Sequence, residues 1–170
     1  PRQERVLFAQ PLQASNDYIS FGNYIIFNYV NQNPEDPNDL KDWNCGSRTY
    51  HRGCDQYYCS HRGTDYMLSP FSWNMMYNNS VEVVAVAEGI IIDKLGNQPD
   101  ESCGEGNTSE WWNYVSIRHH DGTVAVYGHF RTNSLTTKAV YDTVYVGEYL
   151  GIVGSSGMSG GPHLHLEFWE

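Results

Sequence analysis

The chain has 170 residues, of which 40% are hydrophobic, so it is long enough to fold as one domain around a core of its own. Its 20 acidic residues outnumber the 10 basic ones and give a formal net charge of -10, which excludes binding to nucleic acid through a basic face. No apolar run approaches the ~20 residues that a membrane-spanning helix needs. The 14% of aromatic residues and the 16 glycines favour a domain rich in strands and loops over a helical bundle.

The first 60 residues are rich in Asn, Asp, Pro and Tyr and contain one apolar stretch at 24–30. Residues 31–39 predict a surface loop, because Pro and Asx residues interrupt both the helical and the strand period. Neither a linker composition nor an internal repeat divides the chain. We therefore expect a single domain with an irregular, loop-rich N-terminal arm.

The four cysteines indicate an oxidising compartment. Cys45, Cys54, Cys59 and Cys103 are even in number, as expected of disulfides in an extracellular protein, and the three pairings that they allow stay open. A zinc ribbon is the alternative, but it needs close C-x-x-C pairs, and four residues separate Cys54 from Cys59. Because the chain also starts at Pro1 without an initiator Met or an apolar signal segment, we expect a processed, secreted protein.

Strand patterns begin at residue 81. The β-branched run at 81–87 is followed by 90–92, which is apolar on both faces and predicts a buried strand. Two residue pairs, Asp121-Gly122 and Gly147-Glu148, predict hairpin turns. The strands that flank these turns, and the last strand of the chain, are expected at 114–119, 123–129, 143–146, 149–153 and 163–169. This pattern predicts a mainly β domain of antiparallel sheets.

The last predicted strand carries two histidines on one face. Side chains alternate along a strand, so His163, His165 and Glu167 are expected to share one face. Leu164, Leu166 and Phe168 are then expected to face the core. Two imidazoles at this spacing can bind one metal ion together, or one can bind it while the other contacts a metal-bound water. An isolated H-x-H pair would more often be two surface histidines.

A second cluster and a further histidine strengthen the metal interpretation. His61 and Asp65 would lie about 13 Å apart in a straight strand, so the chain must bend, and Gly63 between them permits a bend. His129 ends the predicted strand at 123–129 and can face the same cleft. Two imidazoles and one carboxylate are typical of a catalytic zinc site that keeps a fourth position for water.

Three motifs in this order resemble the zinc-dependent M23 peptidases, the lysostaphin/LytM group. They are H-x-x-x-D at 61–65, a single histidine after Tyr127-Gly128, and H-x-H at 163–165. The strand at 83–89 and the glycine-rich segment at 146–165 are also similar to signatures of this family. The D-Ala-D-Ala peptidases have the same His/Asp/His set but space its first two members more widely, so the spacing here favours the M23 family.

The resemblance covers about residues 43–169 and implies the LytM-type fold, a barrel-sandwich hybrid of antiparallel sheets. It divides the single domain at 1–170 into an N-terminal arm at 1–42 and a catalytic core at 43–170. The usual substrates of the family are the peptide stems and cross-bridges of bacterial peptidoglycan. The resemblance therefore implies a secreted zinc metalloendopeptidase of the cell wall.

The resemblance also implies a role for each site residue. His61, Asp65 and His165 would bind one Zn²⁺ ion. His129 and His163 would lie beside the metal-bound water, where one imidazole takes up a proton and the other stabilises the developing oxyanion. The division of these two roles between the two histidines stays open.

Two alternative functions remain from the sequence. Some secreted members of the family cut glycine-rich proteins such as elastin, and a cell-wall-binding module could keep the fold and a metal without turnover. The complete set of five predicted site residues argues against a non-catalytic module, which would normally have lost at least one of them. We expect a monomer whose partners are peptide substrates, with no nucleic acid and no membrane span.

Overall fold

A computed structural model gives the fold of the chain. It describes residues 5–15, 22–29, 61–101 and 111–169, and the backbone of two short strands at 40–41 and 49–50. Strands predominate among these residues, and the helix α1 (Ser72–Tyr77) is short. No helix in these ranges is long and apolar enough to cross a membrane. The four cysteines, and with them the predicted disulfides, lie outside the described residues.

The described strands form sheets of seven, three and two strands, and every pairing is antiparallel. This confirms the prediction of a mainly β domain of antiparallel sheets. In chain order the strands are β1 (Leu12–Ala14), β2 (Tyr24–Asn28), β3 (Leu40–Lys41), β4 (Thr49–Tyr50), β5 (Gly63–Leu68), β6 (Val81–Val84), β7 (Gly89–Leu95), β8 (Tyr114–Arg118), β9 (Val124–Gly128), β10 (Thr143–Val144), β11 (Tyr149–Ile152) and β12 (His163–Trp169).

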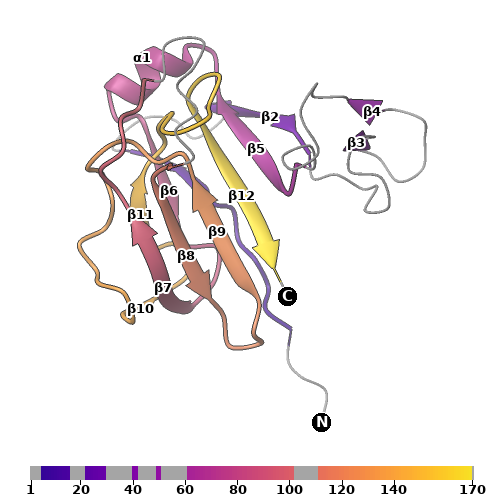
Figure 1. Ribbon diagram of the computed structural model, residues 1–170, viewed down its shortest axis with the longest axis vertical. Helices are drawn as coiled ribbons and strands as arrows, with labels where there is room; N and C mark the ends of the chain where they lie inside the picture. Colours follow the sequence, from indigo (N-terminus) through magenta and orange to yellow (C-terminus); the bar gives the residue numbers. More distant parts are fainter. Residues whose placement is uncertain are drawn as a thin grey trace.

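The seven-stranded sheet runs in the order β10-β7-β8-β9-β12-β5-β2 and, in the part of the chain that is described, stays open (Figure 1). The last strand of the chain, β12, therefore lies inside the sheet between β9 and β5. Leu164 and Leu166 are buried on one face of β12, as the alternation predicts. The expectation that Phe168 also faces the core is wrong: it is 43% exposed and packs against Phe8 at the end of the sheet.

A second sheet, β1-β6-β11, shares the core of the large one. One cluster of buried residues contains members of both sheets, among them Val83 of β6 and Ile117 of β8. Tyr127 of β9 is fully buried, and its hydroxyl accepts a hydrogen bond from the backbone N–H of Val86 at 2.9 Å. Because a buried hydroxyl is costly unless it is hydrogen-bonded, this bond helps to fix how the two sheets pack.

Two local predictions are wrong. The residues Gly147-Glu148 do not join a hairpin, because β10 pairs with β7 whereas β11 pairs with β6 in the other sheet. The apolar run at 90–92 belongs to the longer strand β7, in which Ile91 is fully buried but Ile90 is 41% exposed. Both errors have one cause: turn residues and apolar runs are local signals, whereas strand partners and burial depend on distant parts of the chain.

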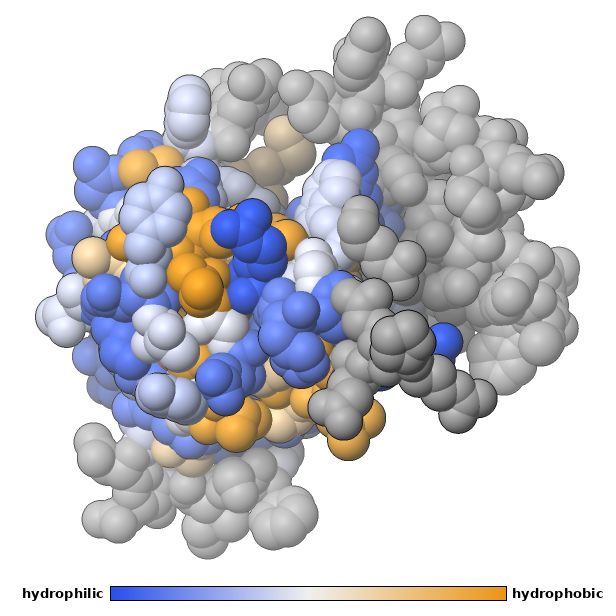
Figure 2. All heavy atoms as spheres, turned by 90° about the horizontal axis from the view of Figure 1, so that it is seen from below, coloured by the Kyte–Doolittle hydropathy of each residue, from blue (hydrophilic) through white to orange (hydrophobic). Residues whose placement is uncertain are grey.

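The predicted hairpin at Asp121-Gly122 is present. β8 and β9 pair around it, and Gly122 has a positive φ of 93°, which suits glycine. Asp121 closes the turn by accepting hydrogen bonds from the backbone N–H groups of Thr123 at 3.0 Å and Val6 at 3.1 Å. On the face of the molecule seen from below, hydrophilic and apolar residues are interspersed (Figure 2).

Candidate metal centre

The three residues that the resemblance implies as metal ligands lie together. His61, Asp65 and His165 each offer one ligand atom, and these atoms all lie within 4.8 Å of one another. Oδ1 of Asp65 is 3.0 Å from Nε2 of His61 and 2.8 Å from Nδ1 of His165, and the two nitrogens are 3.2 Å apart. Two distant parts of the chain thus direct three donor atoms to one place.

The pairing of β5 and β12 brings two of these residues together. His165 and Asp65 are directly opposite in the register, so their side chains share one face of the sheet. His61 lies two residues before β5 begins, so the direction of its side chain does not follow from the alternation of the strand. Gly63, expected to permit a bend, has no positive φ and instead makes room: a Cβ there would lie 2.6 Å from both Nε2 of His165 and the carbonyl oxygen of Leu166.

The three donors fit a transition-metal ion. Two imidazole nitrogens and one carboxylate oxygen are the protein ligands of metal sites that keep an open coordination position. Metal–ligand distances of about 2.0–2.1 Å at tetrahedral angles put neighbouring donor atoms about 3.3 Å apart. The separations here, 2.8 to 3.2 Å, are close to that value. These residues could therefore hold one metal ion with small side-chain shifts.

Each of the three side chains has a further contact that fixes its orientation. Nδ1 of His61 donates to the carbonyl oxygen of Tyr29 at 2.8 Å, so Nε2 is the nitrogen that the ring directs at the centre. The side-chain amide of Asn28 donates to Oδ2 of Asp65 at 2.6 Å. A carboxylate oxygen of Glu167 lies 3.5 Å from Nε2 of His165. The donor set is thus supported by outer contacts on all three members.

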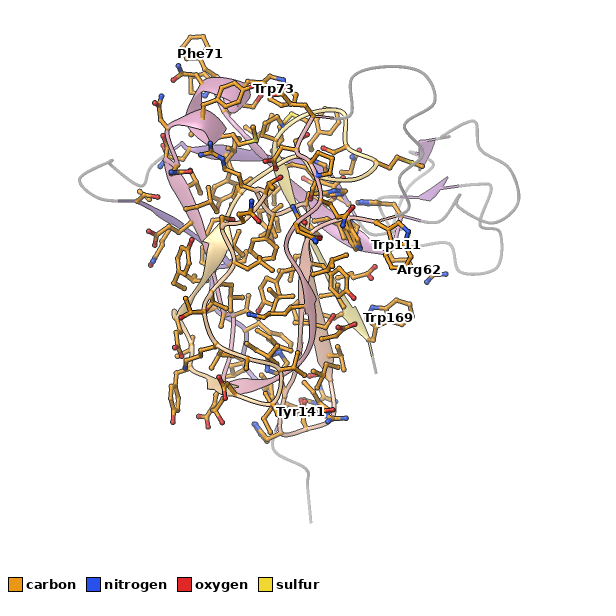
Figure 3. The ribbon with its side chains drawn as sticks, turned by 60° about the vertical axis from the view of Figure 1, so that its left-hand side comes forward. Arg62, Phe71, Trp73, Trp111, Tyr141 and Trp169 are labelled. Atoms are coloured by element: carbon orange, nitrogen blue, oxygen red, sulfur yellow. The ribbon has the colours of Figure 1, made fainter. Side chains whose placement is uncertain are left out.

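The end of β12 holds the Glu167 carboxylate in turn. Nε1–H of Trp169 donates to Oε1 of Glu167 at 3.1 Å. The guanidinium carbon of Arg62 lies 5.1 Å from the ring centroid of Trp169, and the two side chains lie side by side in Figure 3. A cation over an aromatic face contributes roughly 0.5–1 kcal/mol at an exposed site. Arg62 and Trp169 therefore help to fasten the carboxylate that orients His165.

Opposite charges meet in the centre. Burial by itself would raise the pKa of Asp65, but hydrogen bonds with His165 and His61 outweigh burial and hold that pKa well below its usual value. Burial would lower the pKa of His165, yet hydrogen bonds with Asp65 and Glu167 raise it to about 9. Asp65 is therefore ionised at neutral pH, as a metal-binding carboxylate must be.

His129 reaches the centre through an unusual backbone conformation. It follows β9, whose Tyr127 is buried in the core, so strand alternation would send His129 to the core as well. Its φ is instead 62°, in the left-handed region, and its ring centroid lies 4.4 Å from that of His163. For a non-glycine residue this conformation costs about 1–2 kcal/mol. The backbone thus departs from the strand where an imidazole enters the centre.

His129 and His163 are held in the same tautomer. Nδ1 of His129 lies 2.6 Å from the carbonyl oxygen of Ser156, and Nδ1 of His163 lies 2.7 Å from that of Gly161. Carbonyl oxygens only accept, so Nδ1 carries the proton in both rings. Nε2 of His163 is 3.7 Å from Oδ1 of Asp65. Burial lowers the pKa of His129 well below its ordinary value, so its ring is neutral at neutral pH.

One cleft of about 350 Å³ is lined by all five of the predicted histidine and aspartate residues. The remaining walls combine apolar side chains with an amide and two glycines: Phe27, Asn28, Met67, Trp112, Met158, Gly160 and Gly161. Apolar walls with a few convergent polar groups are typical of a site that binds a small molecule or a short segment of a chain.

Asn28, Tyr29 and Trp112 belong to the centre although no motif singled them out as site residues. Asn28 and Tyr29 lie in the predicted irregular arm, and their contacts depend on strand pairing that the sequence does not display. The ring centroid of Trp112 lies 4.7 Å from that of His129 and 5.5 Å from that of His165. Trp112 lies just before the predicted strand at 114–119, but nothing in that pattern marked it as a site residue.

The fold and the centre define the class of the protein: an antiparallel β domain with a cleft of histidine and aspartate side chains that could hold a metal. The sequence model of peptidase family M23 matches residues 61–170, which is more than half of the chain. The chain belongs to peptidase family M23. The five predicted site residues lie inside the matched segment, and β2 lies outside it.

Curated relatives match a shorter segment. The DD-carboxypeptidase/endopeptidase Mpg of Neisseria meningitidis serogroup B is 36% identical over 85 residues. The protein of the same name from Neisseria gonorrhoeae matches to the same extent. The match covers 50% of this chain and 16% of the relative, so the chain spans a small part of the length of these proteins.

Two solved structures share the fold. The catalytic domain of the prophage-encoded M23 protein EnpA from Enterococcus faecalis has a TM-score of 0.51 and 22% identity, and the match covers 86% of this chain and 81% of that one. A zinc-containing peptidase from Vibrio cholerae has a TM-score of 0.51 and 20% identity, covering 92% of this chain and 36% of that one. These likenesses agree with the predicted fold class.

Proposed function

We propose that this chain is a secreted zinc metalloendopeptidase that hydrolyses peptide bonds in the stems or cross-bridges of bacterial peptidoglycan. The observation that carries the proposal is the convergence of His61, Asp65 and His165, together with His129 and His163, on one cleft. Membership of a peptidase family supports peptide hydrolysis. The name of the Neisseria relatives, DD-carboxypeptidase/endopeptidase, supports cleavage within a peptide.

His61, Asp65 and His165 would hold the zinc ion. Two imidazoles and one carboxylate are a zinc set that leaves one coordination position open, and the Vibrio cholerae peptidase of the same fold is zinc-containing. When bound, zinc polarises the scissile carbonyl and lowers the pKa of its water to near 7. Asp65 stays ionised, and the bond from Nδ1 of His61 to Tyr29 directs Nε2 at the centre, so both residues are oriented for binding.

His129 and His163 supply the proton transfers. The ring of His129 is neutral with a lone pair on Nε2, so it can take a proton from an attacking water and return one to the leaving amine. His163, when protonated, can donate from Nε2 to the oxygen that gains negative charge. Because the two rings share one tautomer and one cleft, exchanging the two roles leaves the proposal unchanged.

The walls of the cleft suit a narrow peptide with small side chains. Gly160 and Gly161 present no side chain to the cleft, and a Cβ on Gly160 would meet nothing within 4 Å. Phe27 and Met158 border the same cleft with apolar surface. Glycyl and alanyl segments, which cell-wall peptides contain, fit such walls.

Clearing of a peptidoglycan suspension tests the proposal. We expect wild type to clear it, and a chelator to stop clearing until zinc is restored. His163→Ala is expected to keep about one zinc ion per chain but to slow clearing at least ~100-fold, the usual contribution of a general acid or base. His120→Ala, at an exposed histidine outside the cleft, is the matched control and should clear like wild type.

Three outcomes would contradict parts of the proposal. Loss of zinc from His163→Ala would overturn the assignment of the ligands. A wild type that binds zinc but cleaves neither peptidoglycan nor glycine-rich peptides would be a non-catalytic module. Cleavage of a glycine-rich protein such as elastin, without clearing of peptidoglycan, would replace the substrate. Mass spectrometry of products from defined muropeptides then identifies the bond.

A further inference from the structure

Strand β2 contacts the metal centre although it lies outside the segment that the family model matches, 61–170. The side-chain amide of Asn28, its last residue, donates to Oδ2 of Asp65 at 2.6 Å. The carbonyl oxygen of Tyr29, the next residue, accepts from Nδ1 of His61 at 2.8 Å. Two consecutive residues thus orient two of the three proposed ligands.

A β-bulge gives Asn28 its position. Ile26 lies opposite Tyr66 in the pairing of β2 with β5, and the register then shifts, so that Asn28 rather than Phe27 lies opposite Asp65. In an antiparallel pair, residues directly opposite share a face, and neighbours along a strand alternate. In a regular register Asn28 would therefore face the other side of the sheet. The extra residue re-aims its amide at Asp65.

The contact determines which carboxylate oxygen faces the centre. The terminal torsion of an aspartate is broad, so a carboxylate without contacts samples several orientations. Asn28 holds Oδ2 of Asp65, and Oδ1 is then the oxygen that lies 3.0 Å from His61 and 2.8 Å from His165. An amide N–H donor also favours the ionised carboxylate. The orientation that the proposed ligand set needs is thus prepared before a metal arrives.

We propose that Asn28 is a positioning residue of the metal centre, which raises the affinity for zinc by fixing the carboxylate of Asp65. The inference rests on the proposed function in one respect, that the centre binds zinc. It makes the bulged strand β2, part of the predicted arm, a component of the functional unit. Outer contacts of this kind typically change metal affinity 10- to 100-fold.

Asn28→Leu in the full chain tests the proposal, because leucine has a similar volume but cannot donate. The dissociation constant for Zn²⁺ is measured by competition with a chromophoric chelator, and thermal melting is recorded with and without Zn²⁺. We expect the dissociation constant to rise at least ~10-fold and the increase in Tm on adding zinc to shrink. Asn97→Leu, the same change at an exposed asparagine outside the cleft, should leave both unchanged.

A purely structural role for Asn28 would lower the Tm of the metal-free and zinc-loaded forms equally and leave the dissociation constant unchanged, and that result overturns the proposal. Asn28→Ala is measured alongside in case leucine does not fit, and failure of both variants to fold would also assign Asn28 a structural role. A wild type that binds zinc without hydrolysing peptides contradicts the proposed function only. Zinc binding by wild type is measured before the variants are compared. A wild type that binds no zinc contradicts both the proposed function and the proposed role of Asn28.

Discussion

Strands β12 and β2 border β5 on its two sides and contribute to the metal centre in different ways. β12 is paired along both edges and supplies the histidines themselves, His163 and His165. β2 is the last strand of the sheet order and supplies outer contacts from Asn28 and Tyr29. A ligand must be placed to within a few tenths of an ångström, which pairing on both edges provides. The comparison teaches that the paired interior strands β5 and β12 place Asp65 and His165, whereas the bulged strand at the end of the sheet orients Asp65 and His61.

The largest effect is expected from Gly63→Ala, which disturbs the contact between β5 and β12. The new Cβ would lie 2.6 Å from both Nε2 of His165 and the carbonyl oxygen of Leu166, so the ring and the strand must shift. We expect a loss of about 1–3 kcal/mol in the free energy of unfolding, as overpacking causes. We also expect a larger loss of zinc affinity than in Asn28→Leu. Denaturant titration and zinc competition measure the two.

Gly160→Ala is the matched control for that substitution. Its Cβ would meet nothing within 4 Å and its φ is not positive, so stability and zinc affinity should stay as in wild type. Should Gly63→Ala bind zinc as tightly as Gly160→Ala, the interior pairing does not set the donor positions, and the contrast between the two strands fails.

A smaller effect is expected from Glu167→Gln, which changes an outer contact on the β12 side. The substitution keeps the shape but removes the charge beside Nε2 of His165. We expect the dissociation constant for zinc to rise about 10-fold, similar to Asn28→Leu. Glu148→Gln, which alters an ion pair with Lys138 and a hydrogen bond from the Tyr145 backbone, both outside the cleft, is the control. If Glu167→Gln binds zinc as tightly as wild type, the contact from Glu167 does not orient His165, and only the contacts from β2 orient the proposed ligands.

The smallest effect is expected from Asp121→Asn, at the hairpin turn between β8 and β9. Hydrogen bonds from the Thr123 side chain and the Val6 backbone lower the pKa of Asp121 to about 2. Because that pKa lies below the unfolded value of about 3.9, the contact stabilises the fold above about pH 4 and is lost as the pH falls towards 2. Urea titrations should show that Asp121→Asn loses less stability than wild type between those pH values.

Zinc affinity at neutral pH should stay unchanged in Asp121→Asn, since the turn does not line the cleft. An acid-induced loss of stability as large as that of wild type would show that this carboxylate does not contribute to the pH dependence.

The residues of the centre were predictable because they stand at conspicuous spacings. His163 and His165 share a strand face by simple alternation, and β12 spans the predicted residues. His61 and Asp65 form a short motif, and the register then brings Asp65 opposite His165. Each of these steps needs only the period of a strand and the chemistry of imidazole and carboxylate.

The remaining features depend on interactions that a sequence pattern does not contain. The bulge that turns Asn28 towards Asp65 is a property of two paired strands, and a one-residue shift reverses the face of a side chain. The same holds for β10 and β11, whose turn residues Gly147-Glu148 do not reveal that their partners lie in different sheets. The positive φ of His129 contradicts local preference and is retained where the centre needs its ring.

The position of Trp112 gives this protein a built-in optical reporter. Its indole packs over Gly128, where a Cβ would overlap the ring, and lies edge-on to the imidazole of His129. Indole fluorescence responds to the charge and polarity of groups in contact with the ring. We therefore expect the emission of Trp112 to change when the neighbouring imidazoles gain a proton or bind a metal ion. Metal binding can then be followed in real time without an attached dye.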